Sequence, residues 1–203
     1  MRFQVPDFAD NSEAFFRCAR QRLLQGAGET SKPDNGLRAA AVLVPIVPRD
    51  EGMMVLLTLR SHELPTHAGQ IAFPGGKIDA DDASPLAAAL RETYEETGIE
   101  QRFISPTGYL DSYETGTGFT IVPIVGVLSH GFDLVPEPGE VSDIFEVPLK
   151  FLMNPANHMR RKTLWKGRMH EYSAMPYKDR YIWGATAGML LDLYRKMSRI
   201  DGG

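Results

Sequence analysis

Residues 72–99 read AFPGGKIDADDASPLAAALRETYEETGI, and this stretch decides the fold. A diglycine turn is followed by an acidic loop and then by a run with helical spacing. Ser84 and Pro85 suit the N-cap and the first helical position, and Gly98 is placed to end the helix. The stretch therefore predicts a glycine turn, a loop and a helix over about residues 85–97.

The predicted helix carries three acids on one side. Its expected buried stripe consists of residues at helical spacing, namely Leu86, Leu90, Thr93 and Thr97. Glu92, Glu95 and Glu96 share an arc of about 100° away from that stripe, although like charges at this spacing repel by a few tenths of a kcal/mol. Two interpretations remain open: a solvated acidic face, or a site for a hard cation such as Mg²⁺ or Mn²⁺, which prefers oxygen ligands.

The rest of the chain predicts an α+β fold, with helices packed on a mixed sheet. Residues 37–47 and 53–60 should form a hairpin, and Pro45 indicates an edge strand or a bulge. Further strands are expected at 119–129 and 141–149 and in a hairpin over 162–172, and further helices at 12–25 and 181–198.

Composition narrows the class of protein. The 203 residues fit one domain, which we expect at 37–199 after an N-terminal helix and loop at 1–36. A net charge of −4 argues against a nucleic-acid binder, and the single cysteine, Cys18, permits a reducing compartment. Without a signal peptide or a run of ~18 apolar residues, we expect a cytoplasmic protein with no membrane partner. The sequence is compatible with a homodimer.

The acidic helix resembles a known motif. Residues 76–99 are similar to the Nudix box, G-x5-E-x7-R-E-U-x-E-E-x-G-U, where U is a bulky apolar residue. RETYEETGI, residues 91–99, matches its second half at every fixed letter. The first half has one residue more than the general box, and Asp82 stands where the box has Glu.

A longer stretch resembles one branch of that family. LLTLRSHELPTHAGQIAFPGGKIDADD, residues 56–82, is similar to the signature of the coenzyme A pyrophosphatase branch of Nudix hydrolases, in which L-L-T-x-R-S precedes G-x-x-x-F-P-G-G. The extra residue of the box is normal for this branch. One departure is Pro65, where the branch usually has Arg. If that arginine binds a substrate phosphate, Arg60, His62 or His67 would have to replace it here.

The resemblance implies an α/β/α sandwich and Mg²⁺- or Mn²⁺-dependent hydrolysis of coenzyme A to 3′,5′-ADP and 4′-phosphopantetheine. It implies that the metal is held by Glu92, Glu95 and Glu96, directly or through water, with help from the Gly76 carbonyl. Arg91 is expected to hold these carboxylates in place rather than to bind substrate.

Other site residues follow from the same resemblance. The general base is either Glu140, in a loop outside the box, or Glu96. Arg60, Ser61 and Gly75 are expected to contact the substrate, because they lie at a strand end and a turn beside the metal site. Asp79 and Asp82 either brace the acidic loop or are plain turn acids.

Two other functions stay open. The substrate of a Nudix hydrolase with Pro65 can be another small nucleotide, such as ADP-ribose or a dinucleoside polyphosphate. A non-catalytic nucleotide sensor of the same fold is the third reading. Such a module would be expected to lose one of the helix acids, whereas Arg91, Glu92, Glu95 and Glu96 are all present.

Overall fold

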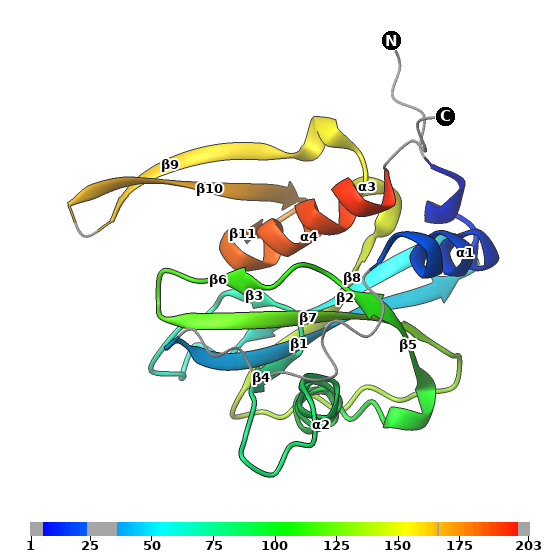
Figure 1. Ribbon diagram of the computed structural model, residues 1–203, viewed down its shortest axis with the longest axis horizontal. Coiled ribbons are helices and arrows are strands. Elements are labelled where there is room, and N and C mark those ends of the chain that lie inside the picture. The colour runs from blue at the N-terminus through cyan, green and yellow to red at the C-terminus, as the bar shows by residue number, and fades with distance from the viewer. Residues whose placement is uncertain (1–5, 24–35, 166, 199–203) are drawn as a thin grey trace.

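The computed structural model describes residues 6–23, 36–165 and 167–198 (Figure 1). Within these residues, the main sheet has eight strands. They are β1 (Arg38–Arg49), β2 (Gly52–Arg60), β3 (Ile71–Ala72), β4 (Gly75–Lys77), β5 (Ile104–Tyr109), β6 (Tyr113–Glu114), β7 (Phe119–Leu128) and β8 (Val141–Pro148). The strand order is β3-β2-β1-β7-β5, while β4 pairs with β1, β6 with β7 and β8 with β2.

Both strand orientations occur in this sheet. β1 and β7 run parallel, from Arg38 opposite Phe119 to Ile46 opposite Val127. β1 and β2 form the predicted antiparallel hairpin, and β8 lies antiparallel on the other side of β2. The sheet is therefore mixed, which confirms the predicted fold class.

The expectation for Pro45 was wrong in part, because β1 is a central strand. Its pairing with β4 ends at Val42, and its pairing with β2 begins at Ile46. Pro45 falls in the gap between these two ladders. A proline cannot donate a ladder hydrogen bond, and at this point no partner strand on that side requires one.

Helices cover both faces of the sheet (Figure 1). The α-helices are α1 (Ser12–Arg22), α2 (Pro85–Thr97), α3 (Leu149–Leu152) and α4 (Gly184–Met197), and the 3₁₀ turns are η1 (Asp7–Ala9), η2 (Gln101–Phe103) and η3 (Pro155–Asn157). α2 packs on one face, and α1 and α4 pack on the other. Among the described residues, no helix combines the length and apolar character needed to cross a membrane.

The largest apolar core lies on the α1 and α4 side of the sheet. Phe8 and Phe15, from the N-terminal segment, are buried in the same cluster as Val44 and Val55 of the central strands and Leu190 of α4. Residues 6–23 are therefore packed onto the main sheet. Residues 24 and 25 of the predicted helix lie outside the described part of the chain.

The C-terminal region differs most from its prediction. Residues 181–183, expected to open the last helix, belong to strand β11 (Arg180–Trp183), because Tyr, Ile and Trp favour extended structure and pair here with β10. The predicted hairpin is longer than expected: β9 (Met159–Trp165) pairs with β10 (Arg168–Tyr177). β9, β10 and β11 form a separate small sheet.

Candidate active site

Helix α2 begins and ends where the sequence predicts. The Ser84 hydroxyl accepts a hydrogen bond from the Ala87 amide at 3.1 Å. Gly98 adopts a left-handed conformation with φ 75°, and its N–H donates to the Tyr94 carbonyl at 2.8 Å. Both ends of the helix are thus capped by local interactions, which sets the limits of the helix that carries the acids.

Glu96 is buried, although the helical wheel grouped it with solvent-facing acids. Its side chain is 3% exposed. The Gly75 N–H donates to Oε2 at 3.0 Å, and Arg60 Nη1 lies 3.7 Å from Oε1. Burial raises the pKa of Glu96 to about 7, with the Gly75 hydrogen bond and the Arg60 charge opposing that rise. Near neutral pH this carboxyl is poised between its two protonation states.

Arg60 ends strand β2 and faces the acids of α2. In the part of the chain that the structure describes, its buried Nε has no hydrogen-bond partner. A buried guanidinium N–H without a partner is uncommon and costly. Arg60 therefore has an unused donor within the acidic site. Its neighbour Ser61 is also buried, and the Ser61 N–H donates to the Glu140 carbonyl at 2.8 Å.

The glycine turn and Glu92 fit closely against each other. A Cβ atom at Gly76 would lie 2.5 Å from the carboxyl carbon of Glu92, so the Glu92 carboxylate would have to move. Partial burial raises the pKa of Glu92, and the charges of Glu95 and Glu140 add to the rise, while Arg91 opposes it. The absence of a side chain at Gly76 thus makes room for the Glu92 carboxylate. A bound cation would stabilise the charged form of this carboxylate.

Arg91 binds several acids at once. It donates Nε to Asp82 Oδ1 at 3.1 Å and Nη2 to Asp82 Oδ2 at 2.9 Å. Its Nη1 contacts both Glu92, at 3.1 Å, and Glu95, at 2.9 Å. The hydrogen bonds to Asp82 are the largest cause of a raised pKa for Arg91. Arg91 therefore ties the acidic loop to the helix and keeps two helix carboxylates side by side.

The acidic loop has its own internal support. The Asp79 N–H donates to Asp82 Oδ2 at 2.8 Å, closing a turn. Asp82 thus contacts both the loop backbone and Arg91. The sequence offered two readings of this acid, and the contacts are those of a brace.

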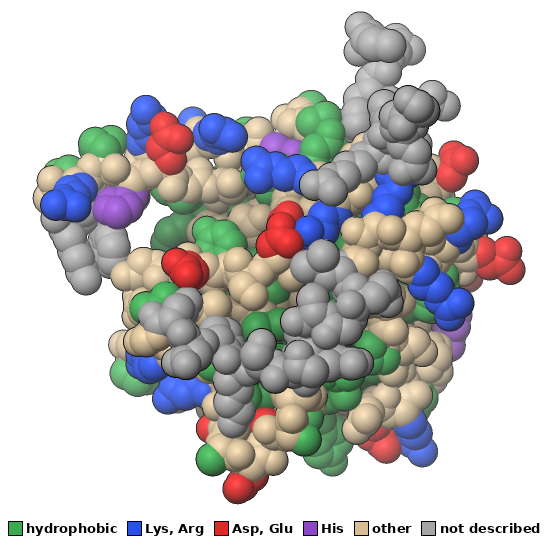
Figure 2. Space-filling view, in the orientation of Figure 1, with side chains coloured by type: hydrophobic (Ala, Val, Ile, Leu, Met, Phe, Trp, Pro, Cys, Tyr) green, Lys and Arg blue, Asp and Glu red, His purple; other side chains and the backbone are tan. Residues whose placement is uncertain are grey.

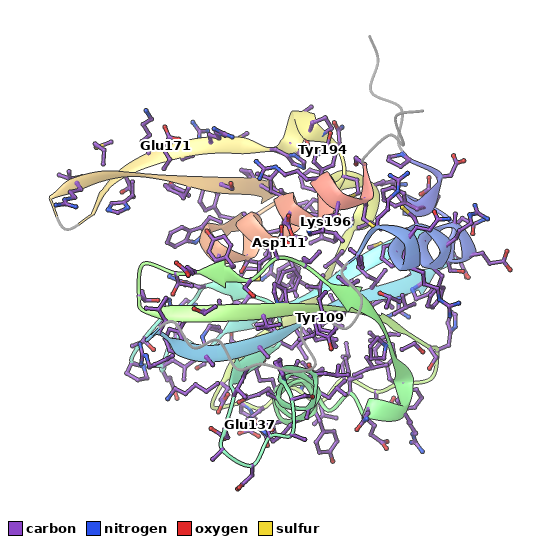
Figure 3. The ribbon with its side chains drawn as sticks, viewed as in Figure 1. Tyr109, Asp111, Glu137, Glu171, Tyr194 and Lys196 are labelled. Atoms are coloured by element: carbon purple, nitrogen blue, oxygen red, sulfur yellow. The ribbon has the colours of Figure 1, made fainter. Side chains whose placement is uncertain are left out.

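A loop over residues 129–140 brings Glu140 to the site. The Val135 N–H donates to the Thr97 carbonyl at 2.8 Å, and the Glu137 N–H donates to the Glu96 carbonyl at 3.1 Å. Figure 3 places Glu137 beside α2. Glu140 is exposed, and its charge contributes to the raised pKa of both Glu92 and Glu96. The expected base therefore lies close to the helix acids.

These residues have the donor chemistry of a divalent-metal site. Burial and mutual repulsion raise the pKa of Glu92 and Glu96, so a cation that replaces the protons would be favoured. Within residues 6–23, 36–165 and 167–198, however, no three acidic, histidine or cysteine side chains are already arranged around one point. Arg91 contacts one carboxylate oxygen of Glu92 and one of Glu95, and the side chain of Glu95 is 54% exposed. The acids are neighbours whose side chains would have to turn toward a bound ion.

The other expected substrate contacts lie around this cluster. Gly75, which the sequence predicts to contact the substrate, donates its N–H to Glu96. Pro65 is exposed in the loop that follows Ser61. In the same loop His67 Nδ1 lies 2.9 Å from Gln70 Oε1, and the ring of His62 packs against Gly69.

Sequence reasoning missed one relationship at this site, the contact between Arg60 and Glu96. The two residues are separated by 36 positions, and no local pattern links them. The signal was the order of the chain: the strand end, the glycine turn and the helix follow one another, and the β2–β3 and β1–β4 pairings fold them together.

Comparison with known proteins agrees with this site. A family model described as "NUDIX domain" matches residues 37–165. Proteins described as "Uncharacterized Nudix hydrolase NudL" from Citrobacter koseri and Escherichia coli are 38% identical over 156 residues, which is 77% of this chain and 81% of each relative.

The chain is also similar to solved structures at lower identity. An Ap4A hydrolase binary complex from C. elegans is 22% identical, with a TM-score of 0.48, over 56% of this chain and 82% of that chain. The NUDIX domain of Shewanella oneidensis NrtR, complexed with ADP ribose, is 23% identical, with a TM-score of 0.47, over 59% and 79%.

The family model covers more than half of the chain and includes the glycine turn, the acidic helix and Glu140. The curated relatives match over most of their own length. Members of this family are pyrophosphohydrolases of small nucleotide substrates and generally use divalent metal ions. From these matches and the geometry of its acidic helix, the chain belongs to the Nudix hydrolase family.

Proposed function

We propose that this Nudix hydrolase cleaves the diphosphate of coenzyme A or its derivatives, giving 3′,5′-ADP and 4′-phosphopantetheine or its acyl forms. The observation that carries the proposal is the position of Arg60. This arginine belongs to the LLTLRS stretch that resembles the coenzyme A branch; its Nη1 lies 3.7 Å from Glu96 of α2, and its buried Nε has no hydrogen-bond partner among the described residues. A phosphate oxygen of the substrate would supply the missing acceptor.

The reaction requires water to attack one phosphorus atom while the other phosphate leaves. When bound, Mg²⁺ or Mn²⁺ neutralises charge on the phosphate oxygens and makes the attacking water more acidic. In our proposal, Glu92, Glu95 and Glu96 hold the ion with the Gly76 carbonyl. Arg91 keeps the acids in place from outside, through Asp82.

We assign proton removal from the attacking water to Glu140. Glu96 is the alternative, because a pKa of about 7 suits a base at neutral pH. Glu96, however, is already bonded to the Gly75 N–H and faces Arg60. Glu140 is exposed at the edge of the cluster and is connected to Ser61 through its backbone, so it can meet a water molecule beside a bound substrate.

Ser61 completes the substrate side of the proposed site. Its hydroxyl accepts a hydrogen bond from the Glu63 N–H at 3.2 Å, which fixes the start of the loop that carries Pro65. Arg60 and Ser61 then orient the diphosphate from the end of β2, opposite the helix acids. A cytoplasmic location remains an expectation from the sequence.

The proposal is tested by offering coenzyme A, ADP-ribose and a diadenosine polyphosphate with Mg²⁺ or Mn²⁺ and separating the products by chromatography. We expect 3′,5′-ADP from coenzyme A at a rate far above that of any product from the others. Arg60→Lys should raise KM for coenzyme A more than it lowers kcat, because a lysine keeps the charge but loses the guanidinium N–H groups. Equal turnover of all three substrates would reject the branch assignment.

Hydrolysis of another nucleoside diphosphate derivative is the second candidate, and one observation favours it. Pro65 replaces the arginine that the coenzyme A branch usually has, and it lies exposed in the loop after Ser61. If that position selects substrate, Pro65→Arg should increase kcat/KM for coenzyme A relative to ADP-ribose. An unchanged ratio would show that the position does not select between the two. If the protein hydrolyses none of these diphosphates, the remaining hypothesis is a non-catalytic nucleotide sensor.

A further inference from the structure

The β9–β10 hairpin has no role in the proposed active site. We call residues 159–177 the arm. It extends from the body of the molecule, with its base beside α4 (Figure 1). Ala174 and Met175 at the base are fully buried, whereas residues 168–171 near the tip are exposed. An isolated two-stranded ribbon is at best marginally stable in water. The outer part of the arm therefore lacks the cover that its base receives.

Apolar side chains are concentrated on this small sheet. Of the eight large hydrophobic residues that are exposed in the described part of the chain, five belong to β9, β10 or β11: Met159, Leu164, Met169, Tyr181 and Trp183. Exposed apolar residues scattered singly are normal, but a cluster on one element marks an interaction surface.

Both faces of the arm carry such residues. Leu164 and Met169 pair across the strands near the tip and are 70% and 63% exposed. By strand alternation they share a face with Met175, which is buried at the base, so the face that meets the core continues outward without a cover. On the opposite face, Tyr172 and Trp183 pack edge to face, with ring centroids 5.5 Å apart.

The arm also differs in charge from the rest of the chain. Residues 159–177 contain five Lys and Arg against one acid, Glu171, so their formal charge is +4. Because the whole chain has −4, the remainder carries −8. Figure 2 shows Lys and Arg side chains along the arm, and Figure 3 places Glu171 on it, on the far side of the sheet from Glu137. The rest of a second copy therefore carries a net charge of opposite sign to the arm, which favours association between the two.

We propose that the arm docks on the body of a second copy of this chain, and that the partner's arm docks in return, which gives a two-fold dimer. In such a two-fold interface, both subunits contribute the same surface. The exposed apolar residues lie near the tip on one face and near the base on the other, over about 23 Å of strand. A flat membrane surface would contact only one face of the arm, so a protein surface, which can enclose both, fits this distribution better.

The contact uses the faces of the arm and not its free edge. Side-by-side pairing of β9 with its own copy would bring Arg160, Arg161 and Lys162 of two chains together. Cationic edge strands are a known protection against that type of pairing. In our proposal these cations face acids of the partner's body. Leu164 and Met169 pack between the arm and that body.

The test measures molar mass by light scattering during size-exclusion chromatography, over a range of protein concentrations. We expect wild type at twice the 22.6 kDa of one chain and the double variant Leu164→Glu, Met169→Glu at the monomer mass. Raising the salt from about 0.05 M to about 0.5 M should weaken the dimer, because exposed charges are then screened. The matched control is Val135→Glu, at a side chain that is 64% exposed and outside the arm. This control should remain dimeric.

Three results would overturn the proposal. The first is a wild-type protein that stays monomeric at every concentration, and the second is a double variant that dimerises as well as wild type. The third is a monomeric protein that binds vesicles of phosphatidylglycerol and phosphatidylcholine through the arm. Circular dichroism of the double variant separates a lost interface from a lost fold. If the double variant fails to fold, Leu164→Ser with Met169→Ser provides the same comparison without adding charge.

Discussion

Asp82 and Arg91 form a two-pronged contact that joins the acidic loop to helix α2. Nε and Nη2 of the guanidinium each donate to a different carboxylate oxygen, at 3.1 and 2.9 Å. Paired contacts of this kind fix geometry as well as charge. The position of two helix carboxylates, Glu92 and Glu95, therefore depends on an acid that lies ten or more residues earlier in the chain.

Asp82→Asn should weaken Mg²⁺ binding without unfolding the protein. The amide retains only one acceptor oxygen, so Arg91 loses one of its paired hydrogen bonds and the helix acids become less well positioned. We expect the Mg²⁺ concentration for half-maximal activity to rise several-fold, with a stability change of about 1–2 kcal/mol. Asp81→Asn, at the exposed neighbouring acid, is the control. Equal metal titrations for the two variants would contradict this role of Asp82.

Glu96→Gln should abolish most turnover while the fold survives. The substitution removes a charge from the proposed metal site with little change in shape, and the amide oxygen can still accept the Gly75 hydrogen bond. We expect kcat to fall by about 100-fold or more. Glu100→Gln, at a carboxylate that is 50% exposed and pairs with Arg102 outside the proposed site, should lose much less. Activity of the Glu96 variant within a few-fold of wild type would remove this residue from the site.

The raised pKa of Glu96 predicts how stability depends on pH in the absence of metal. The folded-state pKa is about 7, and the ordinary value is 4.5. Between these values the folded protein binds more protons than the unfolded chain, so the free energy of unfolding falls as pH rises from about 4.5 to about 7. The full effect of this group is at most about 3 kcal/mol.

Urea unfolding in the presence of a chelator measures this dependence. Wild type should lose stability relative to Glu96→Gln between pH 5 and about 7.5, since the variant lacks the titrating group. Adding Mg²⁺ at the higher pH should restore stability to wild type only. Parallel pH profiles for the two proteins would show that Glu96 titrates normally.

Gly76→Ala should displace Glu92. The added Cβ would lie 2.5 Å from the carboxyl carbon, and the side chain must move away. We expect a loss of Mg²⁺-dependent turnover that exceeds any loss of stability. Gly118→Ala is a useful control, because that glycine has φ 88° and open space around it. It should cost about 1 kcal/mol of stability and leave the metal dependence unchanged. If both variants behave alike, close packing at Gly76 is not important for the site.

Local rules account for the parts of the structure that the sequence predicted. Ser84, Pro85 and Gly98 define α2 through contacts within a few residues, and the β1–β2 hairpin follows from two apolar runs joined by a short turn. The presence of the acids on one helix was equally readable. These features depend on residues that are near one another in the chain.

The remaining features depend on residues that are far apart. Glu96 is buried against Arg60 of strand β2 and Gly75 of strand β4. A helical wheel cannot register this, because it places a residue only relative to its own helix. For the same reason, Pro45 indicated only an edge strand or a bulge: the gap between the β4 and β2 ladders is a property of three strands.

The loop that carries Glu140 is attached to helix α2 through main-chain atoms: the Val135 and Glu137 N–H groups bond to carbonyls at the end of the helix. Contacts of this type do not depend on the identity of the side chains. Side chains within residues 129–139 can therefore change over evolution without shifting the path of the loop. Selection can thus change what the loop presents to a substrate while the acidic helix, with its demanding chemistry, is inherited unaltered.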